Sequence, residues 1–190
     1  MFLVASLAVL AVVSVSRTTT TAATPSTPAY TKDGDLLLPT DYRSWTFLTS
    51  NVAMSYPMAG MNMDNMPQNF GNVFANPDAV KGYEKTGVWP DKTVLLIENR
   101  ASATKPTLTK NAKFQTSSVL GFEAHVKDAS HGGWAFYFFR PTETTGKAFP
   151  KDAACFTCHA KDAAVDTTFV QYYPTLIDIA KQKGTYKNVE

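Results

Sequence analysis

The sequence predicts an α+β fold, mainly an antiparallel β-sheet with short helices. Short runs rich in aromatic and β-branched residues fill the middle of the chain, separated by the Gly, Pro, Asn and Asp residues typical of turns. Apolar residues at helical spacing follow near the end of the chain. Strands in one block, with helices after them, indicate this class because parallel sheets need strands and helices that alternate.

One domain is expected over residues 33–190, because no internal repeat and no second linker follows Asp33. The chain has 190 residues, of which 44% are hydrophobic and 18% charged, as in globular proteins. Its net charge of +2 is too small to indicate a nucleic-acid partner or an electrostatic membrane contact. No nucleic-acid partner is therefore predicted.

The N-terminal segment predicts export. Residues 2–15 are almost wholly apolar, which indicates a signal peptide over residues 1–23, followed by a polar spacer over residues 24–32. The apolar run is shorter than the roughly 20 residues that a transmembrane helix needs. No Lys or Arg precedes the run and its cleavage site is poorly defined, so an uncleaved membrane anchor is the alternative. A periplasmic or otherwise exported protein is expected.

The first half of the domain is expected to hold two strands and a helix. Trp45–Asn51 and Phe70–Ala75 have the composition of strands, and Met54–Asn69, rich in Met, Asn, Pro and Gly, is predicted to be a loop. Asn76 as an N-cap and a proline in the first turn predict a helix over Pro77–Thr86, which the following glycine ends.

Three further strands are expected, two of them in a hairpin. Strand propensity returns in Thr93–Glu98. Val119–Val126 and Trp134–Phe139 are joined by the turn residues Asp128–Gly133, which predicts a hairpin. Because Trp134–Phe139 is apolar at both parities, it should be covered on both faces, by the core on one side and by a large apolar group on the other.

The last helix is expected to begin near Asp166. Apolar residues recur at helical spacing between residues 169 and 180, with Asp166 as a candidate N-cap and Gly184 as the stop. An interior Pro174 predicts a kink or a fresh helix start, because a proline inside a helix costs about 3 kcal/mol.

The only two cysteines lie in the pentapeptide Cys155-Phe-Thr-Cys158-His159, near the C-terminus. This is the attachment pattern of c-type haem. Positions three and four residues apart share one face of a helix, so two thiols can bond to the vinyl groups of haem while the imidazole of His159 reaches the iron. One covalent haem c is therefore predicted, packed on the sheet, and it is the candidate cover for Trp134 and Phe136.

Three other chemistries compete for the same residues. A structural disulfide between the cysteines leaves His159 unexplained. A thioredoxin-like pair needs strands and helices that alternate around the motif. A zinc site needs further ligands, for which His125 or His131 would have to be recruited at an unusual spacing.

The sixth position of the iron decides the function. A Met or a second His there predicts an electron carrier, whereas an open position predicts gas binding or chemistry. His125 and His131 are the other imidazoles, although a surface histidine is the ordinary case at both positions. Five methionines lie in the predicted loop, and three uses are open for them: a thioether ligand to the iron, side chains that fill irregular gaps in the packing, or a copper site. They are Met54, Met58, Met61, Met63 and Met66.

Glu123 is the candidate catalytic residue. It is a carboxylate on an otherwise apolar strand, where burial without a partner costs free energy. Beside an open iron position it would relay protons, and the alternative is a solvated glutamate that points outward.

The residues resemble the cytochrome P-460 and cytochrome c-prime beta family over nearly the whole chain after the leader. The resemblance implies a mainly antiparallel β fold, commonly a homodimer, with haem on the sheet, a proximal histidine and a vacant distal site. The stretches that carry it are residues 36–45, 83–87, 121–128, 133–139, 155–159 and 166–176.

The family has two kinds of member. In the P-460 members a strand lysine is linked to the haem, and in the c-prime beta members this link is absent. Ile97 stands at that position here, just before Glu98, and Lys92 lies five residues too early. Isoleucine has no nucleophilic atom, so the link cannot form there. Glu123 matches an acidic position of the P-460 site, and Phe70 and Phe74 fall near the apolar distal residues of the family.

The sequence thus predicts an exported mono-haem cytochrome with a five-coordinate, His159-ligated iron that binds small diatomic ligands such as nitric oxide in an apolar distal site. One alternative is a P-460-type enzyme that oxidises hydroxylamine or nitric oxide. A second is a Met-ligated electron-transfer cytochrome with a redox partner protein.

Overall fold

The computed structural model describes residues 27–52, 68–104 and 110–189. Their main feature is a five-stranded antiparallel sheet in which strands that follow one another along the chain are neighbours, in the order β2-β3-β4-β5-β6. The fold class is as predicted. The strands are β2 (Thr46–Val52), β3 (Asn69–Ala75), β4 (Thr93–Thr104), β5 (Lys113–Asp128) and β6 (Gly133–Phe139).

Short elements surround this sheet. A two-stranded pair joins β1 (Leu36–Leu37) to β7 (Thr145–Gly146). The helices of the described residues are α1 (Pro77–Thr86), α2 (Ala154–Asp162) and α3 (Ile177–Lys183), with 3-10 turns η1 (Tyr42–Ser44), η3 (Ala129–His131) and η4 (Val170–Tyr172). Among the described residues, no helix has the length and apolarity to cross a membrane.

Helix α1 has the bounds that the sequence predicts. It ends at Gly87, whose φ of +75° is the left-handed conformation that glycine adopts without a steric penalty. Asn76 is its N-cap residue, but the side chain bonds to β4 instead: its Oδ1 accepts from Val94 N and its Nδ2 donates to Lys92 O. The asparagine therefore joins the helix start to the sheet.

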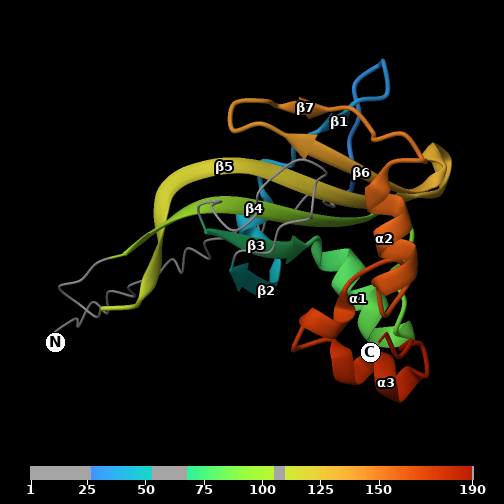
Figure 1. Cartoon of the computed structure of the whole chain (residues 1–190). Coiled ribbons are helices and arrows are strands. Elements are labelled where there is room, and N and C mark those ends of the chain that lie inside the picture. The colour runs from blue at the N-terminus through green and yellow to red at the C-terminus, as the bar shows by residue number, and fades with distance from the viewer. Residues whose placement is uncertain (1–26, 53–67, 105–109, 190) are drawn as a thin grey trace, which may run out of the picture.

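Strands β4 and β5 are longer than predicted. The sequence identified their buried halves, and the remaining parts, up to Thr104 and from Lys113, form an arm whose residues are mostly exposed or half-buried. An arm without a buried face shows no apolar alternation, so its pattern does not indicate a strand. Figure 1 shows this arm extending away from the end of the sheet where α1, α2 and α3 gather.

The prediction of a helix that begins near Asp166 is wrong. Asp166 lies in a turn with a φ of +47°, and the helical residues divide into η4 and α3. Pro174 lies between the two, so the predicted interruption is confirmed, and α3 ends at Gly184 as predicted, with a φ of +71°. The turn replaces the first helical residues because the backbone carbonyl of Thr167 bonds to the His159 side chain.

The two faces of the sheet carry different cores. The face that bears Leu95, His125 and Phe136, here called the helical face, packs against α1, α3 and the segment between α2 and α3. The opposite face bears Leu96 and Phe139 and packs against the chain around β1 and η1. Strand β6 is thus covered on both sides over most of its length, as its composition predicts, although Phe138 on the helical face is 42% exposed.

Glu98 forms a network of ion pairs and hydrogen bonds on the opposite face. Its side chain is 1% exposed, and its carboxylate accepts hydrogen bonds from Tyr42 Oη at 2.8 Å, from Arg43 and, on both oxygens, from Arg100. Burial alone would raise the pKa of Glu98, but the bonds from Arg100 and Tyr42 outweigh it and the pKa is lowered. A buried carboxylate is tolerated here because it is fully paired.

Replacing Glu98 tests this network. In Glu98→Gln we expect the free energy of unfolding to fall by about 1–3 kcal/mol, since the partly buried Arg100 guanidinium loses its counter-charge. Urea unfolding followed by circular dichroism measures the loss. The matched control is Glu143→Gln, whose partner Arg140 is exposed and which should change little.

The same variant has a signature in pH. A carboxyl group whose pKa is lowered on folding stabilises the protein above its ordinary value of 4.5, and this stabilisation is lost as the pH falls through the lowered value. Stability of Glu98→Gln should therefore fall less steeply in acid than that of the native protein. Equal slopes would contradict this role for Glu98.

Candidate functional site

Helix α2 brings Cys155, Cys158 and His159 together on one and a half turns. Neither cysteine is in a disulfide, and both thiols are half-buried. Burial raises the pKa of both, with the nearby Asp162 adding to the effect at Cys158, so both are protonated thiols at neutral pH. The alternative of a disulfide across the motif is therefore not what the structure contains.

The His159 imidazole is held in one orientation by the backbone. Its side chain is 8% exposed, and its Nδ1 lies 2.8 Å from the carbonyl oxygen of Thr167, to which it donates. A carbonyl can only accept, so the proton stays on Nδ1 and Nε2 carries the lone pair that binds a metal. Burial lowers the pKa of His159 against the effect of this bond, which favours the neutral, metal-binding form.

Aromatic rings enclose the same imidazole. Phe169, which follows α2, lies 4.4 Å away between ring centroids, Phe136 on β6 lies 4.5 Å away and His125 on β5 lies 5.1 Å away. Phe136 also meets Phe156 of α2 at 4.7 Å. The attachment motif is thus packed against the helical face of β6, the strand for which the sequence predicted a large apolar cover on one side.

His125 corrects the expectation of an ordinary surface histidine. It is 8% exposed, stacks on Phe136 at 4.1 Å and packs on Trp134 at 4.2 Å. Burial, with smaller effects from His159 and Lys151, lowers its pKa well below the usual value, so the ring is neutral. Its position two residues after Glu123, on the same face of the strand, was the signal available in the sequence. His131, by contrast, is exposed and pairs with Asp128.

Ile97 and Glu123 lie directly opposite each other on β4 and β5, one step along the helical face from Leu95 and His125. Glu123 Oε1 accepts a hydrogen bond from Asn99 Nδ2 at 2.8 Å. Asn99 Oδ1 in turn accepts from Asn69 Nδ2 at 3.0 Å. Burial raises the pKa of Glu123 and the bond from Asn99 works against this. Both asparagines were missed by sequence reasoning, because polar residues near strand ends are common.

Glycines flank Asn99 across the sheet. Gly71 on β3 and Gly121 on β5 are its register partners. A Cβ at Gly71 would lie 2.7 Å from the Asn51 side chain, and one at Gly121, whose φ is +153°, would lie 2.8 Å from Phe139 O. The helical face therefore carries no side chain at two positions beside Ile97 and Glu123.

Phe70 and Phe74 do not join these residues. Strand alternation places them on the opposite face, where Phe74 packs on Tyr42 with 5.5 Å between ring centroids. Val73 and Gly71 occupy the corresponding positions of the helical face. The structure thus does not bring the two expected distal phenylalanines together with His159.

The residues present fit a haem c. They supply two thiols, an imidazole with a fixed tautomer and an apolar surface, and Trp134 Nε1 is a buried donor without a hydrogen-bond partner among the described residues. Such a donor is costly unless a bound group accepts from it. No three His, Cys, Asp or Glu side chains of the described residues group closely enough to hold a metal ion, so the zinc alternative lacks ligands there. The five loop methionines lie outside the described residues.

Comparisons with known proteins agree with this site. A family model described as Cytochrome P460 matches residues 39–170, which is more than two thirds of the chain. The match spans all five strands of the main sheet and helix α2 with its two cysteines and His159. No curated protein matches the chain. The chain belongs to the cytochrome P460 family, which consists of haem-binding cytochromes.

Proposed function

We propose that the protein is an exported mono-haem c-type cytochrome whose five-coordinate iron, ligated by His159, binds small diatomic ligands such as nitric oxide. One observation carries this proposal. The histidine of the attachment motif donates Nδ1–H to the Thr167 carbonyl, the outer-shell bond that orients ligating histidines and increases their basicity.

Cys155 and Cys158 would hold the haem through two thioethers, and His159 would bind the iron. When bound, haem supplies an iron centre with a coordination position for a small ligand. The chain's own residues determine which ligand is favoured. Ile97, which is half-buried, gives the helical face an apolar side chain beside Glu123, and an apolar surface favours a neutral gas because a charged ligand pays for desolvation.

Export follows from the same chemistry, since c-type haem is attached outside the cytoplasm and the first residues of the chain are apolar. We include a homodimer in the proposal, because the family resemblance implies one, and a redox partner protein, because a haem iron that changes oxidation state needs a partner with which it exchanges electrons. Neither partner is needed for the ligand chemistry.

Covalent attachment is tested on denaturing gels stained for haem. The native chain, co-expressed with haem c maturation proteins, should retain the stain after denaturation. The double variant Cys155→Ala/Cys158→Ala should lose it, because no other thiol is present in the chain. A chain that begins at residue 24 and stays in the cytoplasm should also lack it. Stain that survives in the double variant would contradict thioether attachment.

Spectroscopy tests the coordination of the iron. The ferric protein should show a high-spin electron paramagnetic resonance spectrum, and the ferrous protein should form a nitric oxide adduct. His159→Gly should lose the native spectrum, because Nε2 is then absent. His131→Ala, which removes an exposed imidazole, is the matched control and should leave it unchanged. A low-spin ferric spectrum would instead indicate a sixth ligand from the protein.

A second function is favoured by the hydrogen bonds of Glu123. A carboxyl group with a raised pKa, oriented by Asn99 and adjacent to Ile97, is suited to accept protons during oxidation of hydroxylamine or nitric oxide. Its face of the sheet is the one on which His159 packs. No lysine is available at Ile97 for the haem link of P-460 members, so this enzyme would work without it.

The pH dependence of turnover tests the second function. Hydroxylamine oxidation with an artificial electron acceptor should fall at least tenfold in Glu123→Gln, because the amide cannot accept a proton. In the native protein, turnover should decline as the pH falls through the raised pKa of Glu123, since only the ionised form is a base. Glu84→Gln, on the exposed side of α1, is the control. No turnover above that of free haem would exclude this function.

A further inference from the structure

The turn Val165–Thr168, just after α2, has an unusual backbone. Asp166 and Thr167 have φ values of +47° and +61°, so two consecutive residues other than glycine are left-handed. Val165 and Thr168 close the turn by two backbone hydrogen bonds, at 3.3 Å and 2.7 Å. Two left-handed central residues define a type I′ turn, which normally selects Asn-Gly. A β-branched threonine there is strained and persists only if its surroundings hold it.

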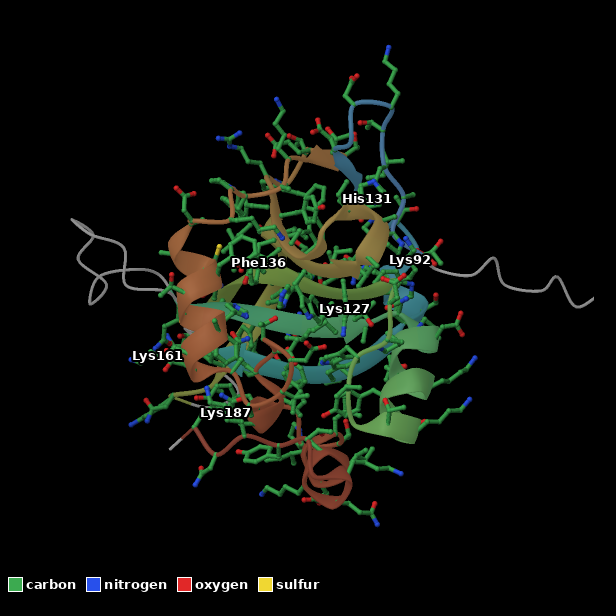
Figure 2. The ribbon with its side chains drawn as sticks, turned by 90° about the vertical axis from the view of Figure 1, so that its right-hand side faces the viewer. Lys92, Lys127, His131, Phe136, Lys161 and Lys187 are labelled. Carbon is green, nitrogen blue, oxygen red and sulfur yellow. The ribbon has the colours of Figure 1, made fainter. Side chains whose placement is uncertain are left out.

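Lys127 of β5 holds this turn. Its ammonium group donates to Asp166 Oδ2 at 2.5 Å and to the Trp89 carbonyl oxygen at 2.7 Å. Figure 2, which looks at the end of the sheet, shows Lys127 near the end of β5, with α1 and α2 on either side of it in this view. The ammonium also lies 5.6 Å from the centre of the Trp134 ring. Because it has these further contacts, the ion pair is more strongly fixed than an isolated pair on the surface.

Trp89 fixes the other end of the turn. Its indole Nε1 donates to Thr168 Oγ1 at 2.8 Å, and that hydroxyl donates to Val165 O at 2.6 Å. Trp89 and Thr168 are both 1% exposed, so these bonds are shielded from water. Lys127 and Trp89 together hold the turn from both sides.

The consequence of the turn lies at its second central residue. The carbonyl of Thr167 points at His159 Nδ1, at 2.8 Å, and the Thr167 hydroxyl lies 3.5 Å from His125 Nε2. If Asp166 changed to a right-handed conformation, the Thr167 carbonyl would turn away from the His159 imidazole. The ion pair between Lys127 and Asp166 is therefore connected to His159 through the backbone of Asp166 and Thr167.

We propose that Lys127 and Asp166 are positioning residues for the proximal ligand: their ion pair keeps the Thr167 carbonyl on His159 Nδ1 and thereby sets the iron–histidine bond and the reduction potential. The inference rests on the proposed ligation of iron by His159. A carbonyl that accepts strongly from Nδ1 makes the imidazole a better electron donor, which stabilises ferric iron and lowers the potential.

The experiment uses the haem-loaded, full-length protein and the variants Lys127→Met, Asp166→Asn and Lys127→Arg. Lys92→Met is the matched control, because Lys92 also pairs with an aspartate beside the same sheet, but that residue, Asp128, lies outside the turn Val165–Thr168. The readouts are the ferrous iron–histidine stretching band in resonance Raman spectra, the midpoint potential and the melting temperature. None of the four variants alters a residue that contacts the haem-binding thiols.

We expect Lys127→Met and Asp166→Asn to lower the stretching frequency and to raise the potential in the same direction. A simple charge effect would move the potential in opposite directions, because one variant removes a positive charge and the other a negative one. In the double variant Lys127→Met/Asp166→Asn, the potential should shift no further than in the single variant with the larger shift. Lys127→Arg should retain the native band, and Lys92→Met should leave it in place.

Two results would overturn the inference and leave the proposed ligation by His159 standing. A native iron–histidine band that none of the variants moves, even if melting temperatures fall, would reduce the ion pair to a structural role. Potential shifts of opposite sign would show a charge effect in place of positioning. A native protein without any iron–histidine band would overturn the proposed ligation by His159 and this inference with it, so the two failures are distinguishable.

Discussion

The alternation of side chains along β6 and along the buried parts of β4 and β5, up to Asn99 and from Gly121, determines which residues can meet His159. Antiparallel register places Leu95, His125 and Phe136 in one row of the helical face, and Val73, Ile97, Glu123 and Phe138 in the next. A shift of one residue in any strand would move its whole set to the opposite face. The buried Glu98, the next residue after Ile97 but on the other face, makes a shift of β4 costly because its carboxylate would lose the hydrogen bonds from Tyr42 and Arg43 of η1.

Several local costs gather around His159. Thr167 is left-handed, Trp134 Nε1 has no partner among the described residues, and a second imidazole is buried beside His159. The first two are features that folding alone would not select, since strain and unpaired donors cost about 1–3 kcal/mol apiece. Their position beside the attachment motif fits a site arranged for a bound group.

The helical face combines properties that favour different chemistries. Ile97 and Val73 make it apolar, which suits a neutral gas, while Glu123 with Asn99 and Asn69 supplies an oriented carboxyl group. The family resemblance implied Phe70 and Phe74 as candidate distal residues, but strand alternation places both on the opposite face. In the proposed function, the balance between ligand binding and oxidation would depend on the carboxyl group of Glu123 beside small and aliphatic side chains.

The sequence by itself determined the fold class, helix α1, the buried halves of the strands and the attachment motif, because periodicity, caps and cysteine spacing are local properties. It also identified Ile97 and Glu123 on neighbouring strands. Only the tertiary structure decided that His125 is buried, that Phe70 and Phe74 face away, and that Asp166 begins a turn instead of a helix. Burial depends on which elements cover a strand, and a left-handed Asp-Thr pair is stable only once Lys127 and Trp89, both distant in sequence, lie against it.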